Sequence, residues 1–455
     1  MRSGNSSNGI SKLVLIGLCS FLLLLPLARI SSLVSEREGR QDSTRWEIWR
    51  SWGEPQSVAG PVLSIPYRRV LPKERGGFFY RQETLRVLPT DLDIQVQVDP
   101  QVRRRGLFEA VVYRADVQVR GTLRLPDLDR FSIDPEEIRW EEASLTFGLG
   151  HLRGLDTNPT LSFRGQLLEL EAGDSQEALV GEALQALIGV ALPAGEDAPF
   201  EVNLSLRGSN GLRFYPLGQE TRAHLSSGWP DPSFQGNFLP IEPRVSAEGF
   251  DATWTVPHFA RSLPQAFVGP LSQEAEQVLL DSAFGADLLL PVDFYQLVSR
   301  CTKYAILFIG LTFGTFLVFE LVSKLRIHPV QYLLVGLALC LFYLLLLALA
   351  EHTGFDLAYL TASVATVGLI TGYSATVLQT RGRASALGTV LTALYGLLYV
   401  LVQMQTYSLL VGSITLFAAL AAAMFLTRHV NWYALDRPGG DDSFEDDMIS
   451  DGNLA

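Results

Sequence analysis

The chain contains 455 residues, of which 48% are hydrophobic and 18% charged, and its formal net charge is −12. This length exceeds that of one ordinary domain, and so acidic a chain is not expected to bind nucleic acid. The averages conceal two different parts, because residues 31–300 are polar whereas residues 304–427 are almost continuously apolar.

The N-terminal part holds an apolar run over residues 13–27, between Lys12 and Arg29. A secretory signal peptide shares this pattern and is the alternative, but a cleavage site with small residues at −3 and −1 is hard to place. We therefore predict a transmembrane anchor over residues 1–30. A helix is expected to continue through residues 33–52.

Residues 31–300 are expected to form a β-rich, sandwich-like domain without disulfides, because apolar residues alternate there and cysteine is absent from it. Gly and Pro separate the alternating segments at short intervals, as in antiparallel sandwiches. Two helices, over 175–190 and 272–284, are predicted from their Ser-Gln-Glu starts. The expected strands cover residues 91–98, 107–125, 144–150, 160–170, 200–207, 212–216, 221–226 and 247–256.

Residues 301–430 are expected to form a five-helix membrane bundle. Runs of this length can cross a bilayer core of about 30 Å at about 1.5 Å per residue. The predicted spans are residues 304–322, 329–350, 357–378, 386–402 and 407–426. Residues 431–455 are strongly acidic, which is typical of a solvated, disordered tail.

The distribution of basic residues among the short loops predicts the orientation. The loops 351–356 and 404–406 contain no Lys or Arg, whereas the alternate loops are basic. By the positive-inside rule, both termini and the acidic tail are expected in the cytoplasm, with residues 31–300 in the periplasm. The basic residues placed inside are Arg2, Lys12, Lys324, Arg326, Arg381, Arg383 and Arg428.

Several multi-residue motifs are shared with one known family. Those of the soluble part include Gly60-Pro61-Val62-Leu63, Ile65-Pro66-Tyr67, Arg105-Gly106-Leu107-Phe108-Glu109 and Phe238-Leu239-Pro240. Those of the membrane part include Lys303-Tyr304, Phe319-Glu320, His328-Pro329-Val330-Gln331-Tyr332, Phe342-Tyr343-Leu344 and Glu351-His352. With these motifs the chain resembles the CreD family of bacterial inner-membrane, cell-envelope integrity proteins. It departs from the family at Gln405-Thr406, where an acidic pair is usual.

The resemblance implies a polytopic inner-membrane protein that contributes to envelope integrity or the envelope stress response, without implying a mechanism. The expected partners are the lipid bilayer and an envelope component or protein that binds the periplasmic domain. The alternative is a transporter or channel for a small solute, with Glu320, Tyr343 and Glu351 along its path. Discontinuous spans in an inverted repeat would favour transport, and the sequence shows none.

The sequence supplies little for catalysis or metal binding. Glu351-His352 with Asp356 could ligate a metal, but a polar helix end explains them as well. Gly412-Ser413 lacks the setting of an intramembrane protease serine. The triple Arg103-Arg104-Arg105 could bind an anionic partner, but a solvated turn is the favoured interpretation. The chain is therefore predicted not to be an enzyme, and no cofactor, metal or catalytic residue is predicted.

The polar residues of the membrane part are the remaining candidates. Glu320 is a candidate by its position, but Lys324 follows at i+4 in the favourable order for a pair, so we expect pairing and packing, with a proton relay as the alternative. We also expect an outer-face charge cluster of Arg300 and Lys303 with Glu351, His352 and Asp356, in which Lys303 pairs mainly with Glu351. Independent charges that face water are the alternative. The functional or structural candidates are Lys303, Glu320, Lys324, His328, Gln331, Tyr343, Glu351 and His352.

Overall fold

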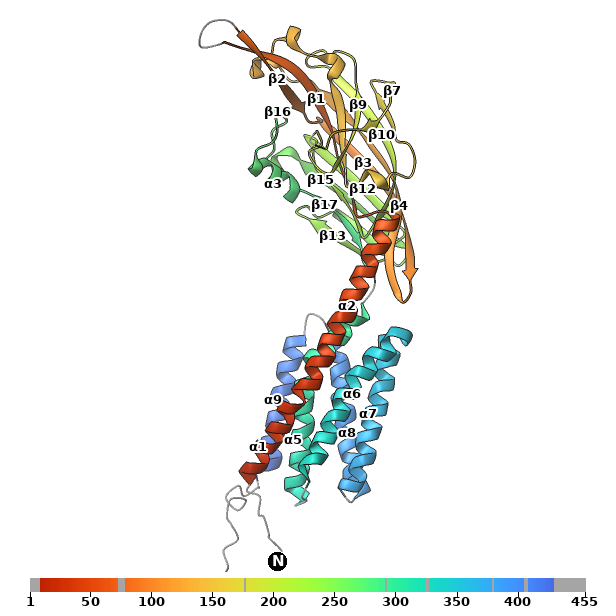
Figure 1. Ribbon diagram of the computed structural model, residues 1–455, viewed down its shortest axis with the longest axis vertical. Helices are drawn as coiled ribbons and strands as arrows, with labels where there is room; N and C mark the ends of the chain where they lie inside the picture. Colours follow the sequence, from red (N-terminus) through yellow and green to blue (C-terminus); the bar gives the residue numbers. More distant parts are fainter. Residues whose placement is uncertain are drawn as a thin grey trace, which may run out of the picture. The chain divides into compact units, whose positions relative to one another are not determined.

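The computed structural model describes residues 9–72, 78–175, 177–290, 293–323, 327–378, 380–404 and 408–428. These residues divide into two compact units, whose elements are labelled in Figure 1. The helical unit combines Met1–Arg40 with Val292–Ala455, and the β unit is Gln41–Pro291.

The β unit contains two sheets (Figure 1). The first sheet has the order β13-β17-β11-β1-β5-β9-β8, with β2 paired to β1 and β16 to β2. Its strands are β1 (Gln56–Pro72), β2 (Phe78–Val87), β5 (Ser144–Leu149), β8 (Glu171–Ala172), β9 (Glu182–Leu187), β11 (Gly211–Phe214), β13 (Pro232–Gly236), β16 (Ala266–Val268) and β17 (Phe284–Leu288).

The second sheet has the order β14-β15-β12-β3-β4-β10-β6-β7. Its long central hairpin is β3–β4, and β10 pairs with β4 along its whole length. The strands are β3 (Asp91–Arg105), β4 (Phe108–Arg124), β6 (Thr160–Phe163), β7 (Gln166–Leu168), β10 (Asp197–Ser209), β12 (Glu220–Ser227), β14 (Ile241–Ser246) and β15 (Gly249–Pro257).

One hydrophobic core draws side chains from both sheets. The alternation in the sequence produces it, because every second residue of a strand points to the same face. On β3, for example, Leu92 and Ile94 are buried while Gln95 and Gln97 are exposed. Trp254 is fully buried and donates a hydrogen bond from Nε1 to the Phe238 carbonyl at 3.1 Å. The prediction of a β-rich domain is confirmed.

The predicted helix over residues 175–190 is wrong. This segment turns and then forms β9, which pairs with β5 on one side and β8 on the other. Gly181 has a φ of +72°, and a Cβ there would lie 2.1 Å from the Leu149 carbonyl oxygen, so the chain leaves helical geometry at this residue. Strand pairing on both sides has overridden the helical propensity of the segment.

The predicted helix at 272–284 is confirmed as α3 (Gln273–Asp281), but it is shorter than expected. Ser272 caps its start by accepting a hydrogen bond from the Ala275 amide at 3.2 Å. Phe284 instead begins β17. The segment expected as one strand over 160–170 is a hairpin of β6 and β7, because Arg164 and Gly165 have positive φ angles of 51° and 79°.

The helical unit contains the apolar helices together with the short, amphipathic α4. Its helices are α1 (Gly9–Leu22), the first part of α2 (Leu24–Trp52), α4 (Phe294–Lys303), α5 (Ala305–Ser323), α6 (Pro329–Thr353), α7 (Phe355–Val377), α8 (Arg381–Gln403) and α9 (Ser408–Thr427). Helix α6 packs against α1, α4 and α7, and α8 packs against α7 and α9. The expected helix over residues 33–52 is confirmed as the continuation of α2.

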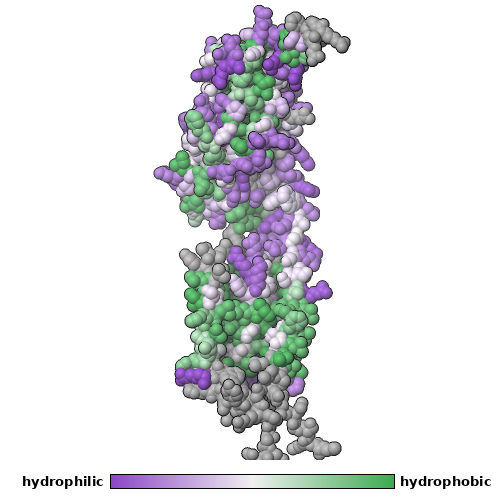
Figure 2. Space-filling view, turned by 90° about the vertical axis from the view of Figure 1, so that its left-hand side faces the viewer, coloured by the Kyte–Doolittle hydropathy of each residue, from purple (hydrophilic) through white to green (hydrophobic). Residues whose placement is uncertain are grey.

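Among the described residues, four helices are long and apolar enough to cross a membrane, and α4 with α5, bent by 46°, would make a fifth. Large apolar side chains face outward on these helices and on α9, including Leu341 (57% exposed), Leu360 (61%) and, on α9, Phe417 (75%). Figure 2 shows the resulting hydrophobic surface across the middle of the unit. Such a surface would be unfavourable in water and suits a lipid environment. Residues 405–407 and the tail 431–455 lie outside the described residues, so the expected number of spans stays a prediction.

Candidate functional site

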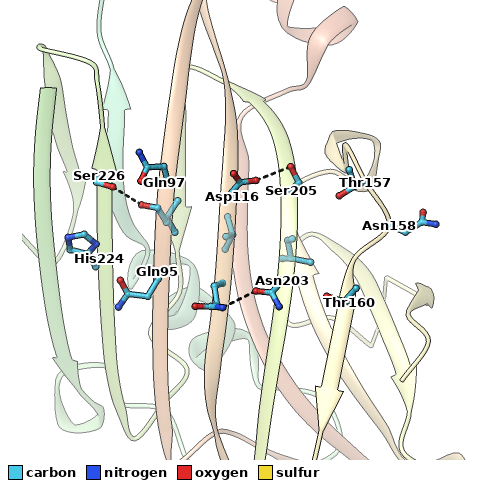
Figure 3. Close-up of a pocket in the computed structure, with 14 residues that line it drawn as sticks. Gln95, Gln97, Asp116, Thr157, Asn158, Thr160, Asn203, Ser205, His224 and Ser226 are labelled. Atoms are coloured by element: carbon cyan, nitrogen blue, oxygen red, sulfur yellow. Dashed lines mark hydrogen bonds between the residues drawn. The ribbon is translucent and has the colours of Figure 1, made fainter. Parts of the chain in front are cut away.

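The outward face of the second sheet carries a polar groove of about 720 Å³ (Figure 3). It crosses β12, β3, β4 and β10 and is bounded by the segment that leads into β6. Its polar lining, which we call the groove residues, consists of Gln95, Gln97, Asp116, Gln118, Thr157, Asn158, Thr160, Asn203, Ser205, His224 and Ser226.

Cross-strand hydrogen bonds hold several groove residues in place (Figure 3). Ser205 Oγ donates to Asp116 Oδ1 at 3.1 Å, and Gln118 Nε2 donates to Asn203 Oδ1 at 3.0 Å. The His224 ring lies 2.8 Å from a carboxylate oxygen of Asp251. The strands thereby present an ordered array of amides and hydroxyls, which can both donate and accept hydrogen bonds.

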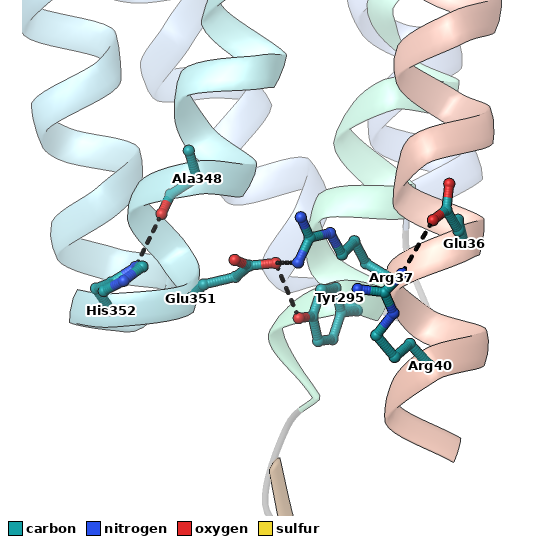
Figure 4. A network of polar contacts seen from close by, with 7 residues as sticks. All are labelled: Glu36, Arg37, Arg40, Tyr295, Ala348, Glu351 and His352. Atoms are coloured by element: carbon teal, nitrogen blue, oxygen red, sulfur yellow. Dashed lines mark hydrogen bonds and ion pairs between the residues drawn. The ribbon is translucent and has the colours of Figure 1, made fainter. Parts of the chain in front are cut away.

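In the helical unit, Glu351 lies in a polar network of three helices (Figure 4). Its Oε1 lies 3.7 Å from Arg37 Nη1 on α2 and accepts a hydrogen bond of 3.1 Å from Tyr295 Oη on α4. The Glu351 side chain is 11% exposed. Its neighbour His352 contacts the Ala348 carbonyl at 3.2 Å through Nδ1.

The prediction that Lys303 is the main partner of Glu351 is wrong. Among the residues that the structure describes, Lys303 forms no ion pair with Glu351, and Arg37 occupies that role. The reason is that α2 reaches the end of α6, and α4 presents Tyr295 there from its first turn. The expected cluster is also divided, because Asp356 instead accepts hydrogen bonds from Tyr399 Oη at 2.9 Å and Gln403 Nε2 at 3.3 Å.

Glu320 is buried, with 5% of its surface exposed. It accepts hydrogen bonds from Tyr332 Oη at 3.0 Å and from the Ile327 amide at 3.2 Å. These two bonds compensate part of the cost of burying a carboxylate. Lys324 lies outside the described residues, so its pairing with Glu320 stays a prediction.

The start of α6 is formed by His328 and Gln331. His328 Nδ1 accepts from the Val330 amide at 3.3 Å, and Gln331 Oε1 accepts from the His328 amide at 3.1 Å. Pro329 occupies the first helical turn, where its missing N–H is not needed. These residues therefore have a structural explanation as a helix cap.

Tyr343 is buried among aromatic side chains of the helical unit. Its ring centroid lies 5.0 Å from that of Phe342, which in turn packs edge-on against Tyr395 at 4.8 Å. Tyr359 joins the group through a 2.6 Å hydrogen bond from its Oη to the Tyr395 carbonyl. This packing joins α6, α7 and α8 and gives Tyr343 a place in the core.

The sequence analysis did not single out the groove residues, Arg37 or Tyr295. The exposed half of the alternating pattern in residues 91–98 is the signal that could have indicated a polar face. In the described part of the chain, no three His, Cys, Asp or Glu side chains are grouped so that they could hold a metal ion.

These features define a class of protein, a membrane protein with apolar helices and a large β-rich unit inserted after the first of them. The family model described as inner membrane protein CreD matches residues 8–433. Inner membrane protein CreD of Escherichia coli (strain K12) is 32% identical over 427 residues, which cover 92% of each chain. The chain belongs to the CreD family of inner membrane proteins, as the sequence motifs indicated.

Solved structures offer only a slight likeness. An M1 zinc metallopeptidase from Deinococcus radiodurans aligns with a TM-score of 0.19 and 12% identity, covering 41% of this chain and 43% of the peptidase. A mutant of that enzyme bound to a Tyr-Ser-Ala substrate aligns with a TM-score of 0.20. The chain thus spans less than half the length of these peptidases, and the likeness is too weak to bear on fold or function.

Proposed function

We propose that this protein contributes to cell-envelope integrity by binding a glycan of the envelope through the groove of its β unit. The observation that carries the proposal is the composition of the groove. Its polar lining consists of amides, hydroxyls, one carboxylate and one imidazole, and none of its fourteen lining residues is Lys or Arg. Such groups match a ligand that is rich in hydroxyl groups and has few negative charges.

The proposal requires the β unit to lie in the periplasm, with both termini in the cytoplasm. The charges at the helix ends support this orientation. Arg381 and Arg383 lie at the start of α8, whereas the ends of α6 and α7 that meet at Gly354 contain Glu351 and Asp356 without Lys or Arg. Single cysteines at Thr255 and Arg383 would test it in cells. A membrane-impermeant maleimide should label the first and not the second.

The proposal describes a binding role without catalysis. The relative from Escherichia coli is described as a membrane protein. The groove holds its one carboxylate, Asp116, in a hydrogen bond with Ser205.

The test uses the full chain in nanodiscs and soluble, uncharged fragments of cell-wall glycan. Replacing Gln118 and Asn203 with leucine removes a hydrogen-bonded pair from the floor of the groove. Thr255→Leu on β15, an exposed position outside the groove lining, is the matched control. The groove variant should lose binding and fail to restore envelope integrity in a strain that lacks the protein. Unchanged binding and full restoration would refute the proposal.

A further inference from the structure

We propose that the β unit contains a second site, an anion-binding pocket specific for phosphate-bearing groups, where α2 ends. Its volume is about 340 Å³. We call it the Trp52 pocket, and it is lined by Arg50, Ser51, Trp52, Gly53, Glu54, His151, Arg153, Gly154 and Arg207. It shares no lining residue with the groove.

The Trp52 pocket concentrates positive charge in a chain whose net charge is −12. Three arginines line it against one carboxylate, that of Glu54. The guanidinium carbons of Arg103, Arg114 and Arg207 lie 4.5, 5.8 and 5.9 Å from the Trp52 ring centroid. These guanidinium groups gather positive charge around one aromatic ring, and this charge would attract an anion.

The nearby acids neutralise only part of this charge. Asp156 contacts Arg207 at 3.2 Å and Arg114 at 3.3 Å. His151 lies between two carboxylates, 3.3 Å from Glu54 and 3.7 Å from Glu182. Arg50 and Arg153 form no ion pair with any residue that the structure describes, and both are exposed to an incoming ligand.

A purely structural explanation covers one of these two arginines. Arg50 lies in the last turn of α2, where a positive charge interacts favourably with the helix dipole. Arg153 has no such explanation, because it lies in a short 3-10 turn (Leu152–Gly154) between strands. A phosphate group would join the two, since guanidinium groups bind phosphate oxygens through paired hydrogen bonds.

The backbone around the pocket is closely packed, which fixes the course of the main chain there. A Cβ at Gly53 would lie 2.5 Å from the Arg207 carbonyl oxygen, and one at Gly154 would lie 2.8 Å from the same atom. Gln56 Oε1 accepts a hydrogen bond from the His151 amide at 3.2 Å. Preformed geometry of this kind reduces the entropy cost of binding.

Gln56 also provides an unused donor next to the pocket. Its side chain is 2% exposed, and its Nε2 has no hydrogen-bond partner in the structure. A Cβ at Gly154 would lie 2.3 Å from this nitrogen. A buried donor without a partner is costly, and an oxygen-rich ligand or its water in the pocket would remove that cost.

The test measures the unfolding temperature of the full chain in phosphatidylcholine nanodiscs, with inorganic phosphate or with chloride at matched ionic strength. Phosphate should stabilise the protein beyond chloride, because a ligand of the folded state raises its stability. Arg153→Gln and Arg50→Gln should each weaken the apparent phosphate affinity about tenfold. Arg153→Gln should be as stable as the original protein without phosphate, which separates ligand binding from a structural role. Arg50→Gln should lose a little stability without phosphate, because its charge no longer interacts with the helix dipole.

Arg130→Gln is the matched control, because Arg130 is exposed, forms no described ion pair and carries the same charge. A parallel series in nanodiscs with phosphatidylglycerol identifies the source of the phosphate. Stabilisation by phosphatidylglycerol alone, lost in Arg153→Gln and kept in Arg130→Gln, would indicate a lipid headgroup. Equal loss in the control, or no stabilisation by either probe, would refute the site. Because the probes contain no sugar, this result is independent of the groove proposal.

Discussion

Reversing the charge of Arg37 or of Glu351 alone should destabilise the helical unit. Reversing both should restore most of the lost stability. The two groups belong to α2 and α6, which are far apart in the sequence, and their nearest charged atoms are 3.7 Å apart (Figure 4). Tyr295 donates a hydrogen bond to the same carboxylate oxygen at 3.1 Å.

The magnitude follows from the distance and the exposure. Coulomb's law at this separation gives about 4–5 kcal/mol for an effective dielectric constant of about 20, which is an upper bound. The Glu351 side chain is 11% exposed but that of Arg37 is 37% exposed, so solvent screens the pair. We therefore expect a coupling free energy of about 1–2 kcal/mol between the two charges. Tyr295→Phe should separately lower the free energy of unfolding by about 1 kcal/mol, because it removes one hydrogen bond.

The assay is a double-mutant cycle on unfolding in mild detergent, with Arg37→Glu, Glu351→Arg and the double exchange. A second cycle replaces Arg37→Glu with Lys303→Glu and serves as the control, because Lys303 forms no described ion pair with Glu351. The control cycle should give a coupling close to zero. A coupling below about 0.5 kcal/mol in the first cycle, or a larger one in the second, would show that the pair has been assigned wrongly.

Three further outcomes are expected. Glu320→Ala should cost about 2–4 kcal/mol in detergent unfolding, because the hydroxyl of Tyr332 and one backbone amide lose their buried acceptor; a loss under about 1 kcal/mol would contradict this. Burial and the hydrogen bond to a neighbouring carboxylate raise the pKa of Tyr67 to about 12, so its stabilising contribution is complete below pH 10, the ordinary pKa, and is lost as the pH rises towards 12. The unfolding temperature of Tyr67→Phe should therefore fall less steeply with pH over this interval than that of the original protein. Equal slopes for the two proteins would contradict this. Gly53→Ala should destabilise the β unit by about 1–3 kcal/mol in thermal unfolding, because its Cβ would lie 2.5 Å from the Arg207 carbonyl oxygen, and an unchanged midpoint would contradict it.

The β-rich fold could be predicted because the alternation of apolar residues is a local signal. Over residues 91–98 of β3 the buried residues are the apolar ones of the sequence pattern, residue by residue. The failure at 175–190 has a non-local cause. The segment Glu182–Leu187 contains good helix formers, but β5 and β8 supply backbone hydrogen bonds on both sides, and such pairing is not encoded in the segment itself.

The candidate site residues show the same limit. Glu351 could be recognised from its position at the end of an apolar run, whereas its partner could not, because residues 37 and 351 meet only through the packing of helices. The cap formed by His328 and Gln331 is local, because both residues and Pro329 lie within the first turn of α6 or directly before it. The local sequence thus predicts helix caps and strand faces, whereas ion pairs between distant elements can be identified only from the three-dimensional structure.

The groove and the Trp52 pocket illustrate how strand pairing creates sites that are invisible in the sequence. Gln118 lies opposite Asn203 because of the antiparallel register of β4 and β10, and His224 lies opposite Gln95 because β12 runs parallel to β3. Trp52 meets Arg103 and Arg207, which are distant in the chain, only because the end of α2 packs on this sheet. The β unit therefore offers two chemically different surfaces, one nearly uncharged and rich in hydroxyl and amide groups, the other cationic. In the two proposals this separation matters, because positive charges within the groove would attract phosphate away from the Trp52 pocket.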